Sequence, residues 1–255
     1  MWGRGVFAAC AIAGLTALSP AVPFASYADG PGIVEAQYAD PLNTYPHRIM
    51  GDIREKDSLI VFDDGVGDYL TLSLSVAYPG HVFEDIRPTL GDVDGDGRND
   101  VVVVETSLTQ GASIAVYSVR HGAVVKIAQT PFVGQKNRWY APVGIGDFNG
   151  DGHPDVAFVD RPHLAQVLRI YSLIDGVFLE IATAAGLTNH TIGDDIIWSM
   201  VRRCQGRDEI VLKNTATHTY YTVWAQGGSD QIFGKDTGVP ATYDWAALYK
   251  AAECL

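Results

Sequence analysis

Two short segments of the chain concentrate carboxylates and glycines. In the first segment, four carboxylates fall within nine residues, at Asp92, Asp94, Asp96 and Asp100, with glycines at positions 95 and 97. Negative charges this close repel one another unless a cation lies between them. Calcium suits the segment because it takes about six to eight oxygens in a geometry that a short glycine-containing loop tolerates, and the carbonyl of Arg98 is placed to supply one of them. The segment therefore predicts a calcium site.

The second segment repeats this set with one carboxylate fewer. Its donors are Asp147, Asn149, Asp151 and Asp155, with the carbonyl of His153 in the equivalent place. Because calcium affinity rises with the number of charged ligands, we expect this segment to bind calcium more weakly than the first. The sequence thus predicts about two calcium ions per chain.

Neither segment is an EF-hand loop. An EF-hand requires a bidentate glutamate at its twelfth position and a helix on each side. The twelfth residues here are Val103 and Phe158, and each lies inside an apolar run that is typical of a buried strand. We therefore expect each metal to lie in a turn between two strands.

The two segments belong to an internal repeat. GDVDGDGRNDVVVVE begins at Gly91 and GDFNGDGHPDVAFVD begins at Gly146, while GDIREKDSLIVFD from Gly51 and MVRRCQGRDEIVLKN from Met200 are weaker copies. The aspartate that opens each apolar strand recurs at positions 57, 100, 155 and 208, at intervals of 43, 55 and 53 residues. Such intervals are typical of one four-stranded propeller blade.

These repeats predict an all-β fold: a β-propeller of about four blades, with four antiparallel strands in each. We place the repeats near residues 46–85, 86–135, 140–185 and 190–240, within a single domain over 29–255. Residues 243–254 have helical spacing, but a closing strand is the alternative there. The outer copies lack the full ligand set, because the first is three residues shorter and the last carries Arg202 and Arg203 where carboxylates are needed.

The motifs DxDGDGxxDVVVV and DxNGDGxPDVAFV resemble the calcium-binding loops of FG-GAP or VCBS repeats, the blade units of integrin-type β-propellers. The resemblance extends from about Pro46 to Lys235 and is strongest in the two middle repeats. It implies calcium as the ligand and a role in recognition or adhesion. The calcium ligands that it implies are Asp92, Asp94, Asp96, Arg98 and Asp100 in one loop, and Asp147, Asn149, Asp151, His153 and Asp155 in the other.

The net charge indicates which partners are excluded, and the N-terminal residues indicate the cellular location. Thirty acidic residues face 18 basic ones, for a net charge of −12, which argues against nucleic-acid and anionic-membrane partners. Residues 1–28 read as a signal peptide, with Arg4 before an apolar run too short to span a bilayer and small residues at 26–28. We therefore expect export to the periplasm or the cell exterior. Cys204 and Cys254 are either a disulfide or two separate thiols.

Three further residues precede the first strands of repeats: His47, Trp139 and His190. They either converge on a ligand pocket or pack between repeats. The chain has no GxSxG, HExxH or CxxC motif, so we expect a binding module for protein or carbohydrate and not an enzyme. The alternatives are a structural component of the cell envelope and, less favoured, a polysaccharide hydrolase or lyase. The sequence leaves the ligand, the number of blades and the oligomeric state open.

Overall fold

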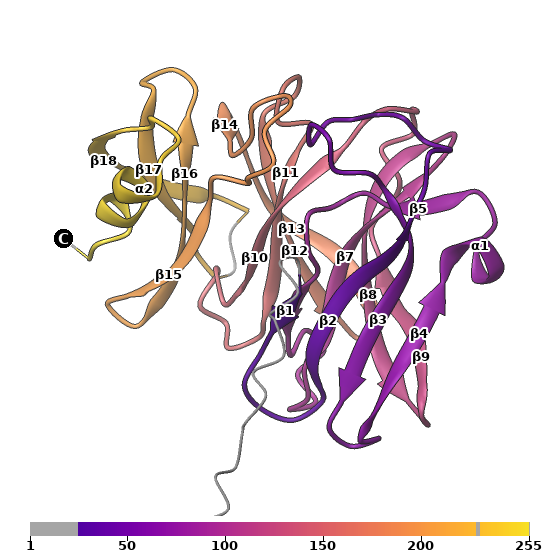
Figure 1. Cartoon of the computed structure of the whole chain (residues 1–255). Coiled ribbons are helices and arrows are strands. Elements are labelled where there is room, and N and C mark those ends of the chain that lie inside the picture. The colour runs from indigo at the N-terminus through magenta and orange to yellow at the C-terminus, as the bar shows by residue number, and fades with distance from the viewer. Residues whose placement is uncertain (1–24, 228–229, 255) are drawn as a thin grey trace, which may run out of the picture.

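The computed structural model describes residues 25–227 and 230–254, and this part of the chain is all-β (Figure 1). Its strands form three sheets of nine, four and five strands. Every ladder between named strands is antiparallel, and two short helices complete the fold. The predicted all-β class is therefore confirmed.

The nine-stranded sheet contains the first two repeats. Its path runs β1-β2-β3-β5-β7-β8-β9, with β4 paired to β3 and β6 paired to β7. The strands are β1 (Ser26–Tyr27), β2 (Ile33–Pro41), β3 (Lys56–Asp63), β4 (Asp68–Ser73), β5 (His81–Phe83), β6 (Thr89–Gly91), β7 (Asp100–Ser107), β8 (Gly111–Arg120) and β9 (Ala123–Gln129), with α1 (Leu74–Ala77) after β4. Because β5 pairs with both β3 and β7, the two repeats share one sheet instead of forming two separate blades.

The third repeat is the four-stranded unit that the sequence suggests. Its strands pair in chain order: β10 (Tyr140–Gly146), β11 (Asp155–Asp160), β12 (Val167–Ile174) and β13 (Val177–Ala185). The turn between β12 and β13 contains Asp175 and Gly176 at φ values of 51° and 75°. Two positive φ values in succession fit a two-residue hairpin turn, for which Asp-Gly is a preferred sequence.

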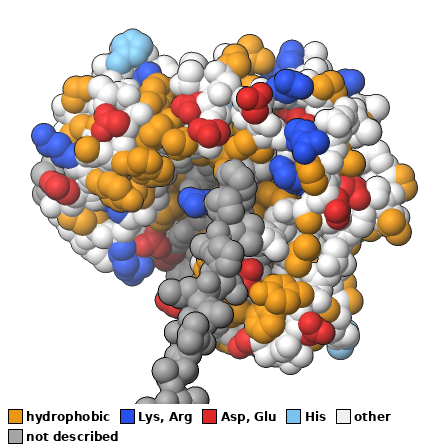
Figure 2. Space-filling model, viewed as in Figure 1, with side chains coloured by type: hydrophobic (Ala, Val, Ile, Leu, Met, Phe, Trp, Pro, Cys, Tyr) orange, Lys and Arg blue, Asp and Glu red, His pale blue; other side chains and the backbone are white. Residues whose placement is uncertain are grey.

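The fourth repeat forms the five-stranded sheet and carries the C-terminal helix. Its elements are β14 (Leu187–Thr188), β15 (Met200–Cys204), β16 (Arg207–Asn214), β17 (Thr219–Ala225), β18 (Ile232–Pro240) and α2 (Trp245–Ala251). The side chain of Asp244 caps α2 by accepting a hydrogen bond from the backbone N–H of Ala247. Figure 2 shows hydrophobic side chains gathered over this C-terminal part of the chain. Within residues 243–254, Trp245–Ala251 thus form a helix, and no closing strand is present there.

A disulfide joins Cys204 at the end of β15 to Cys254 beyond α2, with the two Cα atoms 5.6 Å apart. It resolves the alternative that the sequence left open. The C-terminal segment is thereby tied to the fourth repeat.

The sheets are held together by side-chain packing. One buried cluster contains residues from all three sheets, among them Val104 of β7, Phe158 of β11 and Leu212 of β16. Among the described residues, no ladder of paired strands joins one sheet to another. Strand pairing alone therefore does not close the predicted ring of blades.

The predicted signal peptide, residues 1–28, lies almost entirely outside the described residues. Its last part includes β1, which pairs with β2. Cleavage after Ala28 would remove this two-residue strand and leave the rest of the sheet. No helix in residues 25–227 and 230–254 is long and apolar enough to cross a membrane.

Candidate metal centre

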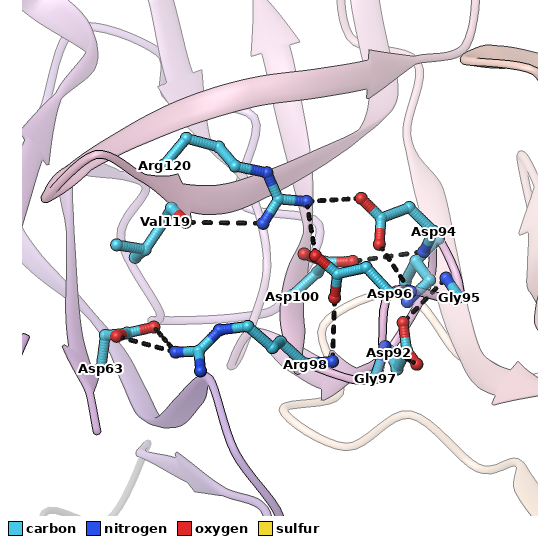
Figure 3. Close-up of polar contacts among 11 residues, drawn as sticks. Asp63, Asp92, Asp94, Gly95, Asp96, Gly97, Arg98, Asp100, Val119 and Arg120 are labelled. Carbon is cyan, nitrogen blue, oxygen red and sulfur yellow. Dashed lines mark hydrogen bonds and ion pairs between the residues drawn. The ribbon is translucent and has the colours of Figure 1, made fainter. Parts of the chain in front are cut away.

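The first acidic loop, residues 92–100, is a hairpin loop held at both ends by strands. Gly91 at the end of β6 pairs with Asp100 at the start of β7. Within the loop, the two oxygens of Asp92 accept hydrogen bonds from the N–H groups of Gly95 and Gly97, each at 2.8 Å. Gly95 and Gly97 have φ values of 75° and 83°, which glycine adopts without strain. The turn therefore folds around its own carboxylates (Figure 3).

Three carboxylates of this loop converge. Oxygens of Asp92, Asp94 and Asp100 lie within 4.8 Å of one another. Asp96 is placed beside them, because its N–H donates to Asp94 at 3.2 Å. The side chain of Arg98 points away from the cluster and reaches Asp63 at 3.1 Å (Figure 3). A group of oxygen donors this close could hold a metal ion.

Asp100 is the buried member of the cluster, with no exposed surface. Its Oδ2 accepts from the N–H groups of Val93 and Asp94, whereas its Oδ1 lacks a well-formed hydrogen bond and has only the Ser118 hydroxyl nearby. Burial raises the pKa of Asp100 to about 6. An unpaired buried oxygen costs about 1–3 kcal/mol, which a bound cation would offset. The residues of the loop therefore fit a hard cation such as calcium.

Arg120, at the end of β8, also faces this loop. Its Nη2 lies 2.5 Å from Asp94 and 3.1 Å from Asp96 (Figure 3). The protein thus supplies a cation of its own to two of the predicted ligands. Sequence analysis missed this residue because it lies 20 positions after Asp100, and only the pairing of β7 with β8 and the turn to β9 bring it back to the loop.

The second acidic loop, residues 147–155, has the same hydrogen bonds. Asp147 accepts from the N–H groups of Gly150 at 2.7 Å and Gly152 at 3.0 Å, as Asp92 does in the first loop. Asn149 accepts from the N–H of Asp151, which in turn accepts from the N–H of His153. The two loops are therefore copies in structure as well as in sequence.

The buried aspartate of the second loop has more partners. Asp155 has no exposed surface, and its two oxygens accept from Phe148 N–H at 3.0 Å and Ser172 Oγ at 2.6 Å. Burial raises its pKa to about 6, as in the first loop. Among the described residues, no arginine or lysine forms an ion pair with an acidic side chain of this loop. The second loop thus differs from the first in lacking a cationic partner.

Each acidic loop is fastened to a strand outside its own repeat. Asn99 of the first loop exchanges backbone hydrogen bonds with Pro31 and Ile33, next to and within β2. In the second loop, the carbonyl of Phe148 accepts from Ala225 at the end of β17. The first loop is therefore joined to β2, the strand that pairs with β3 of the first repeat, and the second loop is joined to the fourth repeat.

The outer repeats use their strand-opening aspartates differently. Asp57 accepts hydrogen bonds from Ser73 and from the N–H of Ser75. Asp208 pairs with Arg203 at 3.0 Å and accepts from Asp147 N–H. Both carboxylates are thus engaged with protein groups.

The three residues suggested as a pocket lie near one another. His47 and Trp139 line one cavity. His190 contacts the edge of Trp139, with ring centroids 4.9 Å apart, and lines the neighbouring cavity. Trp139 and His190 are both buried, so neither ring offers a face for a sugar to stack on. His163, which sequence analysis missed, lines both cavities, and no repeat motif marks it.

Comparison with known families identifies the repeat. Residues 92–158 match the FG-GAP-like repeat, a span that runs from the first ligand of the first acidic loop into β11 after the second. No curated protein is similar enough to be matched with the chain. Taken with the two acidic loops and the strands that follow them, the match shows that the chain is an FG-GAP repeat-containing protein.

Proposed function

We propose that the protein is an exported, calcium-binding β-propeller that acts as a recognition or adhesion module for a protein or carbohydrate, and not as an enzyme. The observation that carries the proposal is the converging set of Asp92, Asp94 and Asp100, whose fully buried member has an oxygen without a well-formed hydrogen bond. The second acidic loop repeats the turn and its hydrogen bonds, but among the described residues only the carboxylates of the first loop converge.

Calcium would act where each acidic loop is joined to a strand outside its own repeat. In the first loop it would be held by the carboxylates of Asp92, Asp94, Asp96 and Asp100, with the carbonyl of Arg98. Neutralising these charges removes repulsion in a loop whose Asn99 is bonded to β2, the neighbour of β3 in the first repeat. The second loop would act in the same way on the fourth repeat, through Phe148. The bound ions would therefore stiffen the framework that presents the surface loops.

A ring arrangement of the repeats is supported by contacts between segments far apart in the chain. Ile49, before the first repeat's β3, accepts a backbone hydrogen bond at 3.0 Å from Gly193, which precedes β15 of the fourth repeat. Asn137 N–H donates to the hydroxyl of Tyr45 at 2.8 Å. The first repeat thus touches both the fourth repeat and the segment leading into the third, as blades around a common axis do.

Calcium titration into chelator-treated protein, followed by calorimetry, tests the metal role. We expect about two ions per chain, with Asp96→Ala and Asp151→Ala each losing one. Asp52→Ala, in the shortened outer copy, is the matched control and should leave the stoichiometry unchanged. Folded protein that takes up no calcium would overturn the metal assignment.

A binding screen tests the recognition role. Calcium-loaded and calcium-stripped protein would be applied to an array of glycans and purified extracellular proteins. We expect saturable binding that is stronger with calcium, because the acidic loops are then fixed. Turnover of a polysaccharide by the purified protein would instead identify an enzyme.

A further inference from the structure

A small cavity lies where loops of different repeats meet. It has a volume of about 200 Å³ and is lined by residues that precede β3, β10 and β15 or follow β11. Ile49, Leu164 and Ile192 supply the aliphatic part of its walls, and two histidines and two arginines are among the other lining residues. Leu164 and Ile192 are 65% and 67% exposed, which is unusual for large apolar side chains that only pack. The cavity is therefore suited to one small apolar group.

His163, which lines this cavity, carries a ring nitrogen that can accept a hydrogen bond. The carbonyl of Asp194 can only accept, so His190 carries its proton on Nε2, 2.9 Å away. Burial lowers the pKa of both histidines, that of His163 to about 4, so both rings are neutral. His190 Nδ1 then accepts from His163 Nε2 at 3.0 Å. The other nitrogen of His163, Nδ1, is left with a lone pair and no partner among the described residues.

His47, which also lines this cavity, is held in place by a buried carboxylate. Its Nδ1 lies 2.5 Å from Glu84 Oε1, and Glu84 has no exposed surface. Thr106 donates to the other oxygen of Glu84 at 2.8 Å. Glu84 thereby fixes the orientation of the His47 imidazole, so this part of the cavity wall is rigid where a ligand would contact it.

Arg138 gives the rim of the cavity a free positive charge. Among the described residues it forms no ion pair, and its guanidinium donates to the carbonyl of Asn137 at 2.8 Å. Arg161, by contrast, is neutralised by Asp160 through two hydrogen bonds. Of the two arginines that line the cavity, Arg138 is therefore the one without a carboxylate partner among the described residues. It points to an anionic group on the ligand.

We propose that this cavity binds a small amphipathic anion, with one aromatic ring or branched aliphatic body and a carboxylate. The apolar body would lie against Ile49, Leu164 and Ile192. The carboxylate would pair with Arg138, and a hydroxyl on the far end of the body would donate to His163 Nδ1. This inference builds on the recognition role proposed above and names the chemistry of what is recognised.

Three related probes test each contact separately. 4-Hydroxyphenylacetate carries the ring, the carboxylate and the hydroxyl; phenylacetate lacks the hydroxyl, and 4-hydroxyphenylacetamide lacks the charge. Binding would be followed by NMR shifts of backbone amides in calcium-saturated protein. We expect 4-hydroxyphenylacetate to bind roughly 3-fold more tightly than phenylacetate, and about 10-fold more tightly than the amide.

Two variants assign these preferences to residues. Arg138→Gln should abolish the preference for the acid over the amide, and His163→Phe should abolish the preference for the hydroxylated ring. Arg54→Gln removes an arginine outside the cavity and is the matched control for lost charge. Unchanged thermal unfolding of each variant shows that it is folded. If the preferences survive in the variants, the assigned contacts are wrong.

The same experiment distinguishes a failure of anion binding in the cavity from a failure of calcium binding by the acidic loops. Calcium uptake is read by calorimetry on the same protein before the probes are added. Normal calcium stoichiometry with no saturable binding of any probe up to about 10 mM would overturn the cavity proposal and leave the calcium role intact. Equal binding of the acid and the amide would overturn it as well. Probe binding without calcium uptake would support the cavity and overturn the metal assignment.

Discussion

Replacing Arg120 with glutamine should strengthen calcium binding at the first acidic loop. The guanidinium lies 2.5 Å from Asp94 and 3.1 Å from Asp96, so an incoming calcium ion must displace it or share these oxygens with it. The side chains are about a quarter to a third exposed, and solvent screens their pairing. At about 0.2–1 kcal/mol for each exposed pair, removing both releases about 1 kcal/mol. That corresponds to roughly a 5-fold lower dissociation constant.

The calcium affinity of each acidic loop must be measured separately. In an Asp151→Ala background only the first loop titrates, and calorimetry at low ionic strength gives its affinity with and without Arg120→Gln. Arg98→Gln serves as the control, since that side chain pairs with Asp63 and Asp64 and not with the cluster. Equal or weaker calcium binding by the Arg120 variant would refute the idea that this arginine competes with the ion.

Arg120 also changes the affinity order expected from the sequence. Counting carboxylates alone makes the first loop the stronger site. Arg120 cancels the one negative charge by which the first loop exceeds the second, so we expect the two loops of the native protein to bind calcium with similar affinity. The glutamine variant should restore the difference.

Three further predictions follow from buried groups and the backbone. Burial raises the pKa values of Asp100 and Asp155 to about 6, so the stability that they contribute without metal is present at low pH and is lost as the pH rises through 6. Calcium must displace those protons, so it should raise the unfolding midpoint strongly at about pH 7.5 and little at about pH 5 in scanning calorimetry; equal shifts would contradict this. In urea unfolding, Gly111→Ala should cost more than about 2 kcal/mol, because φ is 76° and the new Cβ would lie 2.3 Å from the carbonyl oxygen of Gln135. Gly122→Ala, at φ 75° with open space around it, should cost about 1 kcal/mol, and equal losses would rule out the clash. Reducing the disulfide, which closes a 50-residue separation, should lower stability by up to about 4 kcal/mol in urea, and an unchanged midpoint would show that it adds nothing.

Local sequence signals identified most of the strands. The run Val101–Val104 and its counterpart after Asp155 are β-branched and apolar, and both form fully buried strands, β7 and β11. The Asp-Gly pair at 175 and 176 marked the hairpin between β12 and β13. The sharing of one sheet by two repeats was not visible, because β5 has only three residues and its pairing with β3 and β7 depends on tertiary position.

Some residues of the candidate site could be predicted from the sequence, and others could not. The donors of the acidic loops are close in sequence, so spacing alone marked them. Arg120 and His163 act through contacts made by strand register and loop convergence, and a single sequence carries no signal for either. His190 was noticed for its place before a repeat, but its role in orienting His163 required the hydrogen bonds to be seen.

The pairing of β5 with both β3 and β7 bears on how the protein loses its structure. In an array of separate blades, each unit can open while its neighbours stay folded. Here the ladder that ends one repeat begins the next, so opening either repeat exposes unpaired backbone groups of the other. Although β3 and β5 pair at one position only, Lys56 with Phe83, we expect the nine-stranded sheet to open locally as one unit. Removing the first repeat, which includes β5, would leave the edge of β7 at Glu105–Ser107 open and available for pairing with another chain.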